Sequence, residues 1–329
     1  MAGYIARRLV LAVFTIVAIS ILSFMIIHLP PGDYVTSYIA QMAASGGSVS
    51  ADQAQNLRIQ YGLDQPIYVQ YLRWVGMMGH GNFGVAMEYQ LPVTQVIGDR
   101  LWLTIAVSVA ALLFTWAIAL PIGIYSAVRQ NSVLDYVFTF IGFVGLAIPN
   151  FLLALLVLYF GFKYFNVNIG GLFRPELNDA PWSWVKFQDL LAHLPVPAIV
   201  LGMAATAGQI RIMRANLLDE KRKPYVITAR AKGLPEHRVI LKYPVRVALN
   251  PFASTIGYTL PYIVSGSVIV SIVLSLPTVG PLLYKALIAL DMFLAGTIIL
   301  LLGTLTVIGT LLSDLLLMWL DPRIRLESR

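Results

Sequence analysis

The chain has 329 residues, of which 58% are hydrophobic and only 12% are charged, and its mean hydropathy is +0.76. Because soluble domains carry about 25% charged residues, this balance excludes a soluble protein and predicts an all-α, polytopic membrane protein. The formal net charge is +7, but the cations lie in alternate segments between apolar runs, which disfavours nucleic-acid binding, and the absence of Cys excludes disulfides and thiolate metal sites.

An apolar run at residues 9–27 follows Arg7 and Arg8. It exceeds the roughly 7 to 15 residues of a signal-peptide core and reaches the ~20 residues that a membrane-spanning helix needs. The residues after it, 28–33, contain two prolines rather than a small-residue cleavage motif. We therefore expect residues 1–29 to hold an uncleaved first membrane helix.

Residues 30–100 carry no apolar run of membrane-spanning length, and we expect them to form an external loop or cap. Within them, residues 51–61 are predicted to form an amphipathic helix. A second external segment, 163–194, is predicted to be a loop, and its Trp182 and Trp184 suit the membrane interface.

Five further spans are predicted in a core membrane domain at residues 101–329. Pro121 and Pro149 lie inside predicted spans, where they should cause kinks. The six predicted spans are residues 9–29, 101–128, 136–162, 195–210, 247–276 and 292–320.

The Lys and Arg residues set the orientation of these spans. With the N-terminus inside, sixteen of the 23 cations lie on the cytoplasmic side and seven lie outside. Cytoplasmic loops carry the excess of cations, so both termini are predicted to be cytoplasmic.

The segment at residues 211–246 carries ten Lys and Arg residues against three acidic residues. Pro224 is predicted to end one helix, residues 225–232 to form a short second helix, Gly233 to supply a turn with positive φ, and Pro235 to block continuation. This order indicates a docking surface for a cytoplasmic partner. The alternative is an ordinary positive-inside loop, which explains the charge but not the ordered pattern.

Few polar residues lie inside the predicted spans. Asp314 is the one clear acid, and we expect it to pair with an Arg of the basic segment rather than to serve transport. Asn150 and Gln209 either line a polar path or serve the helices locally, with Asn150 capping the helix after Pro149. Ser265 either lines the same path or belongs to a stretch of small residues suited to close helix packing.

The sequence offers no catalytic or metal chemistry of its own. No phosphate-binding loop, zinc-binding His pair or nucleophile elbow is present, and the four histidines are scattered over different segments. Any nucleotide energy must therefore come from another subunit. The lack of acids near the middle of the spans also disfavours a proton-coupled transporter.

Residues 228–234, Thr-Ala-Arg-Ala-Lys-Gly-Leu, are similar to the loop signature of the permease subunit of binding-protein-dependent ABC importers, in its dipeptide/oligopeptide form. Ile227-Thr228-Ala229 stands where the strict signature has Glu-Ala-Ala. One departure from the branch is residues 290–293, where it usually has a more polar segment. Further segments that resemble the same branch are residues 61–66, 70–74, 92–101, 276–280 and 321–325.

This resemblance implies a type I ABC importer-like permease in a bacterial cytoplasmic (inner) membrane. It implies a second homologous permease, two ATP-binding subunits that hold ATP and Mg, and an extracytoplasmic solute-binding protein; this chain itself would hold no cofactor. The cargo would be di- or oligopeptides. The implied ATPase-coupling residues are Tyr225, Thr228, Ala229, Arg230, Ala231, Lys232, Gly233 and Leu234.

Two alternatives remain open from the sequence. The same architecture could import a nickel chelate, glutathione, an opine or an oligosaccharide, because the binding protein largely selects the solute. An autonomous channel or secondary transporter would be expected to show intramembrane charges or inverted repeats, and neither is evident.

Overall fold

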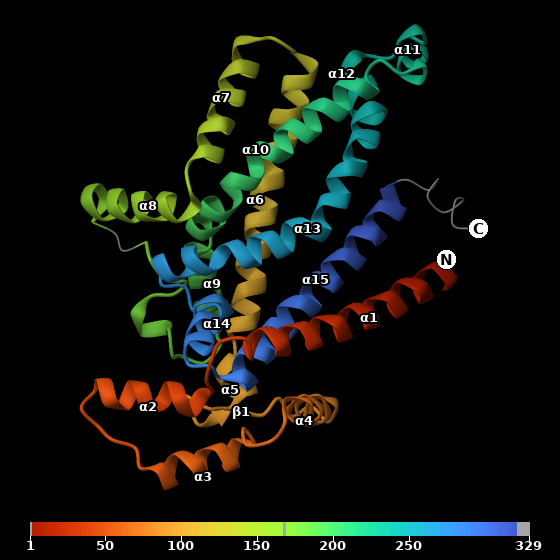
Figure 1. Cartoon of the computed structure of the whole chain (residues 1–329). Helices are drawn as coiled ribbons and strands as arrows, with labels where there is room; N and C mark the ends of the chain where they lie inside the picture. The colour runs from red at the N-terminus through yellow and green to blue at the C-terminus, as the bar shows by residue number, and fades with distance from the viewer. Residues whose placement is uncertain (1, 167–168, 321–329) are drawn as a thin grey trace. The chain divides into compact units, whose positions relative to one another are not determined.

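The computed structural model describes residues 2–166 and 169–320, with side chains for all of these except residues 2–5, 253, 255–266, 319 and 320. The described chain is helical apart from one short antiparallel hairpin and a 3-10 turn (Figure 1). The hairpin pairs β1 (Val85–Ala86) with β2 (Leu91–Pro92). The helices are α1 (Ala2–Ile27), α2 (Tyr34–Ala44), α3 (Ala51–Tyr61), α4 (Ile67–Gly79), α5 (Val93–Ile97), α6 (Arg100–Val128), α7 (Val133–Ala147), α8 (Asn150–Phe165), α9 (Trp184–His193), α10 (Pro195–Glu220), α11 (Pro224–Ala231), α12 (Glu236–Lys242), α13 (Pro244–Val273), α14 (Val279–Ile288) and α15 (Met292–Leu320).

The all-helical membrane character predicted from composition is confirmed. Among the described residues, four helical stretches are long and apolar enough to cross a membrane, and a fifth is formed if the bent pair α7 and α8 counts as one span. The four stretches are Ala6–Ile27, Arg100–Val128, Trp184–Glu220 and Met292–Met318. The predicted run at 247–276 falls largely on α13, a helix of 30 residues.

The predicted span at 136–162 is not a single kinked helix. Its two halves, α7 and α8, meet at an angle of 99° (Figure 1). Ile148 has extended backbone angles, φ −85° and ψ 121°, because the ring of Pro149 excludes the residue before it from the helical region. The prediction located the break correctly but underestimated the change of direction.

The predicted span at 195–210 ends too early, and the predicted loop at 163–194 is partly helical. α10 continues to Glu220, and α9 precedes it after an N-cap at Ser183. Arg is a good helix former, so Arg211 marks the end of the apolar run but does not end the helix.

The chain forms two compact units. The larger is built mainly from Thr104–Pro277, and the smaller combines Ile5–Leu103 with Thr278–Val307. The predicted helix at 51–61 is confirmed as α3, which begins with a capping box at Ser50 and Gln53 and ends at Gly62 with φ 69°.

The smaller unit has a core in which residues 34–97 pack on the chain around the start of α15. Fully buried side chains in this core include Val35, Trp74, Met87, Leu294 and Ile298. Burying this apolar surface ties α2, α4 and the hairpin to a segment that lies about two hundred residues later in the chain.

Asp291 is a buried acid that joins the hairpin to α15. Its Oδ2 accepts the Met87 N–H at 2.6 Å, and its Oδ1 accepts the Leu294 N–H at 3.0 Å. The Tyr34 hydroxyl donates to the Met87 carbonyl at 2.9 Å and so also holds the residue that follows β1. In the sequence, residues 290–293 stood out only because they differ from a family pattern. In the structure, Asp291 accepts hydrogen bonds from the backbone of both Met87 and Leu294.

Burial raises the pKa of Asp291 from 3.8 to about 6, although backbone N–H donors favour the charged form. The folded state therefore binds this proton more tightly than the unfolded state does. The stability contributed by protonation is fully present below pH 3.8 and is lost as the pH rises through about 6. The shift corresponds to about 3 kcal/mol.

We expect Asp291→Asn to flatten the pH profile of thermal stability between pH 4.5 and 7.5, because the titrating group is gone. Asp52→Asn, which alters an exposed acid in α3, serves as the control and should keep the wild-type profile. The measurement is the unfolding temperature of the purified chain in detergent across this pH range. Parallel profiles for wild type and Asp291→Asn would contradict the assignment.

Candidate functional site

The basic segment at 211–246 is a succession of helices rather than a loop. Its first ten residues extend α10, and α11 and α12 then lead into α13 (Figure 1). The predicted short second helix is confirmed as α11, whereas Pro224, predicted to end the preceding helix, occupies the first turn of α11, since α10 already ends at Glu220.

Pro224 and Gly233 set the two ends of α11. Pro224 occupies the first turn, where its missing N–H costs nothing and its fixed φ suits a helix start. Gly233 follows the C-cap residue with φ 74°, and its N–H donates to the Arg230 carbonyl at 2.9 Å. The predicted positive φ at Gly233 is confirmed. A Cβ there would meet nothing within 4 Å, so the backbone conformation alone restricts the position to glycine.

The two faces of α11 differ in their surroundings. Val226 and Ala229 are buried in a small cluster with Val239 of α12, and Leu234 and Tyr243 pack against it. Ala229 and Leu234, both predicted to couple to a partner, therefore serve mainly to seat α11 on α12.

The other face of α11 is open. Ile227 is 57% exposed and Tyr225 is 39% exposed, and Thr228, Ala231 and Lys232 are exposed beside them. Ile227 was not among the residues predicted to couple to a partner. The sequence does offer one signal for Ile227, because it is an aliphatic residue in a strongly basic segment. An aliphatic side chain in such a segment suits a surface that contacts a partner better than one that faces water.

An ion pair closes the turn between α11 and α12. Arg230 donates to Glu236 through Nε at 3.0 Å and through Nη2 at 2.7 Å. The Arg230 hydrogen bonds hold the pKa of the Glu236 carboxyl below its usual range. Arg230 was predicted as a coupling residue, and the structure places it as a brace across Gly233. Glu236 was missed, although an opposite charge six residues away across a turn signals such a brace.

Buried apolar side chains fasten α10, α12 and α13 to one another beneath α11. The cluster includes Met213 and Leu217 of α10, Ile240 of α12, and Val245 and Phe252 of α13. Next to it, Lys221 Nζ donates to the Ala127 carbonyl at 2.9 Å, and burial lowers the pKa of this lysine. A displacement of α11 must therefore move several long helices together.

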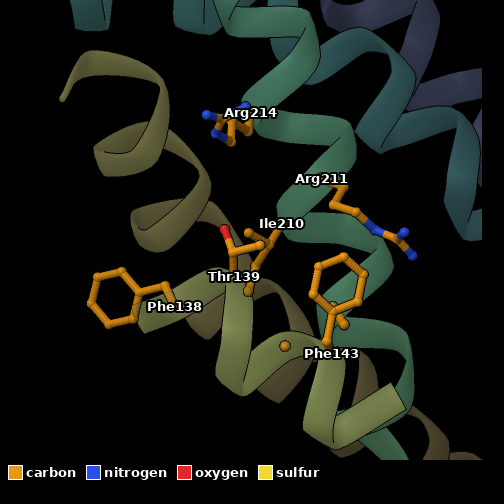
Figure 2. Close-up of a pocket in the computed structure, with 8 residues that line it drawn as sticks. Phe138, Thr139, Phe143, Ile210, Arg211 and Arg214 are labelled. Carbon is orange, nitrogen blue, oxygen red and sulfur yellow. The ribbon is translucent and has the colours of Figure 1, made fainter. Parts of the chain in front are cut away.

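A second ion pair joins α7 to α10. Arg214 donates to Asp135 through Nε at 3.1 Å and through Nη2 at 2.9 Å, and the Asp135 side chain is almost fully buried. Nearby, the Arg211 guanidinium lies over the Phe143 ring at 5.6 Å (Figure 2). The predicted third span began at Tyr136 and so did not include Asp135, the acid that pairs with Arg214 of α10.

The residues predicted to line a path occupy separate positions. Gln209 is buried on α10, and Asn150 is half-buried as the first residue of α8. The Ser265 side chain lies outside the described residues, and so do residues 321–325. The path, and the pairing of Asp314 on α15 with an arginine, stay predictions. No cluster suited to a metal ion occurs in the part of the chain that the structure describes.

Two protein-family models together match nearly the whole chain. Residues 119–326 match the model for the binding-protein-dependent transport system inner membrane component, and residues 1–108 match the model for the N-terminal part of such membrane components. The chain is 35% identical over 325 residues to the oligopeptide transport system permease protein AppB of Bacillus subtilis (strain 168), covering 98% of this chain and 99% of that protein.

Two further similarities agree with these matches. The dipeptide transport system permease protein DppB of Escherichia coli (strain K12) is 30% identical over 341 residues, with 99% of both chains covered. Among solved structures, a chain of the MetNI methionine ABC transporter in inward-facing conformations aligns with a TM-score of 0.54 and 18% identity, over 69% of this chain and 97% of that one. At that identity the structural match supports the fold alone.

We expect Arg214→Gln to destabilise the chain by about 3–5 kcal/mol, because it leaves the buried Asp135 carboxylate unpaired. The double variant Asp135→Asn with Arg214→Gln should recover part of this loss, since no buried charge then remains. Arg222→Gln, at an exposed cation of the same segment, is the control. The free energy of unfolding in detergent measures all three, and a cost below about 1 kcal/mol for Arg214→Gln alone would refute the buried pair.

Proposed function

The chain belongs to the family of binding-protein-dependent transport system inner membrane components, and from this premise we propose how it works as one half of an ATP-driven importer. It is a multi-pass permease of the inner membrane and a transport subunit rather than an enzyme. In the proposed complex it pairs with a second homologous permease, two ATP-binding subunits and an extracytoplasmic solute-binding protein.

We place six spans in the membrane with both termini in the cytoplasm. In support, the four long apolar stretches, the bent pair α7 and α8, and the 30-residue α13 together supply six crossings. The excess of Lys and Arg on the side of α11 and α12 supports a cytoplasmic location for that side.

The coupling element is α11 with Gly233 and the start of α12. The observation that carries this role is the two-faced packing of α11, which is seated on α12 by Val226 and Ala229 and presents Tyr225, Ile227 and Thr228 outward. An ATP-binding subunit would dock on the outward face. Nucleotide-driven movement of that subunit would then displace α11, and the buried cluster beneath would pass the displacement to α10 and α13.

The cargo is proposed to be a di- or oligopeptide, because the full-length relatives are named oligopeptide and dipeptide permeases. ATP and Mg would bind to the partner ATPases. Asn150, Gln209 and Ser265 are proposed to line the path, and the external segment at 30–100 to meet the binding protein. A nickel chelate, glutathione, an opine or an oligosaccharide is the second candidate class of cargo.

Affinity purification from the native membrane tests this assembly. The tagged chain, extracted in mild detergent, should bring down a second permease and one or two ATPases with phosphate-binding loops. The ligand that remains bound to the purified cognate binding protein would then identify the cargo. A chain that purifies alone and transports in liposomes would overturn the proposal and favour an autonomous channel.

We expect Gly233→Val to reduce transport at least several-fold, because a β-branched residue at positive φ costs about 1–2 kcal/mol or more and distorts the end of α11. Gly76→Val is the matched control, since Gly76 has equally open surroundings but lacks a positive φ. Solute uptake is measured at equal abundance in the membrane. Normal uptake by Gly233→Val would rule out a coupling role for this turn.

We expect Ile227→Asp to weaken retention of the ATPase subunits about ten- to a hundredfold, because it places a charge in the centre of an apolar contact. Ile59→Asp, at a residue of α3 with nearly the same exposure (56%), should leave retention unchanged. Quantitative co-purification provides the readout. Equal retention in both variants would show that the ATPases dock elsewhere.

A further inference from the structure

A cavity of about 580 Å³ lies in the larger unit, where α10 gives way to α11 and α12 gives way to α13. Its volume falls within the range of small-molecule sites. Most of its lining side chains are charged or aromatic rather than aliphatic. Those that matter here are Glu220, Lys223, Tyr225, Lys242, Tyr243 and Arg246.

The cations of this cavity come from three helix boundaries. Lys223 is the N-cap of α11, Lys242 is the last residue of α12, and Arg246 lies in the first turn of α13. Lys242 and Arg246 are only four residues apart, but Lys223 lies 19 residues before Lys242, so its place in the same cavity is set by the fold rather than by local sequence periodicity. The fold brings three positive charges to one concave surface.

The cavity is lined by three cations and one carboxylate. Its one carboxylate, Glu220, accepts a hydrogen bond from the Tyr225 hydroxyl. In the described part of the chain, no ion pair joins Lys223, Lys242 or Arg246 to a carboxylate. Arg214 and Arg230 of the same basic segment, in contrast, each hold a carboxylate.

We propose that this cavity binds the phosphate headgroup of an anionic membrane phospholipid. Lys and Arg side chains from different elements can surround a phosphate, and the Tyr243 and Tyr225 rings suit the interface between headgroups and water. This inference rests on the proposed function, because it takes this end of α10 and α13 to lie at the cytoplasmic surface.

The position of the cavity favours a lipid over a free anion. Arg246 and Val247 stand at the start of the long α13, and Val247 is 39% exposed. Leu241, on the preceding helix, is 58% exposed. A headgroup in the cavity would therefore have apolar surface beside it for its acyl chains. Basic pockets at the cytoplasmic ends of membrane helices bind anionic headgroups by this combination of charge and apolar contact.

A bound headgroup would affect the movement of α11. It would neutralise the mutual repulsion of Lys223, Lys242 and Arg246 and so draw the start of α11 toward the start of α13. Of the outward residues of α11, Ile227 and Thr228 do not line the cavity, whereas Tyr225 does. The lipid and an ATPase would therefore share the Tyr225 side chain and otherwise contact different residues.

Native mass spectrometry of the purified full complex tests the site. Phosphatidylglycerol and phosphatidylcholine are titrated separately, and we expect the anionic lipid to bind the wild type more tightly. At about fivefold per cation, Lys242→Gln with Arg246→Gln should weaken phosphatidylglycerol binding about 25-fold. Arg222→Gln with Arg238→Gln removes the same charge from exposed positions outside the cavity and should leave binding nearly unchanged.

Each other result would overturn the inference. Equal loss in the two double variants would show that the charge of the whole segment attracts lipid, with no defined site. Equal binding of both lipids would remove the headgroup role. Displacement of the lipid by millimolar inorganic phosphate would identify a site for a free anion instead. These readouts are independent of transport and of ATPase retention, so a failed docking model and a failed lipid site are distinguishable.

Discussion

The constraint on which the rest of this structure depends is that a backbone N–H or C=O in hydrocarbon must find a partner within its own helix. Proline can break such a helix by removing a donor, although Pro121 lies inside α6 and Pro251 lies inside α13, and helices also end where the chain reaches water. Pro149, Pro195, Pro224 and Pro244 all stand at or next to a helix start. The irregular backbone of the larger unit is thereby confined to a few short segments, and the proposed coupling element is built between two of them.

Much of this arrangement is readable from local sequence, and the exceptions share one physical cause. The apolar runs, the helix at 51–61 and the positive φ of Gly233 each depend on neighbouring residues, and each was predicted correctly. Pro149 accounts for a break at its position and helix-forming Arg residues allow α10 to continue, but neither local signal fixes the 99° angle between α7 and α8 or the end of α10 at Glu220. The Arg214–Asp135 pair joins residues 79 positions apart, and no local pattern announces such a contact.

The candidate site, too, could be predicted only in part from local sequence. Sequence reasoning found the residues of α11 but could not separate those that face a partner from those that face α12. Ala229 is the clearest example, since its place in the motif suggests a contact and its burial assigns it to packing. A short helix with so small a buried face owes its position to the covalent turns and the Arg230–Glu236 brace at its ends, and such a helix can be displaced without unfolding.

The hydrogen bond from Met87 to Asp291 also sets an order for biogenesis. The two residues are 204 positions apart, so at 5–20 residues per second the ribosome needs about 10 to 40 seconds to supply the acceptor after the donor. During that interval the external segment lacks Leu294 and Ile298, which complete its core. Nascent chains of this kind therefore expose an unfinished apolar surface until the last membrane helix is made, which gives chaperones and proteases at the membrane a defined period in which to act.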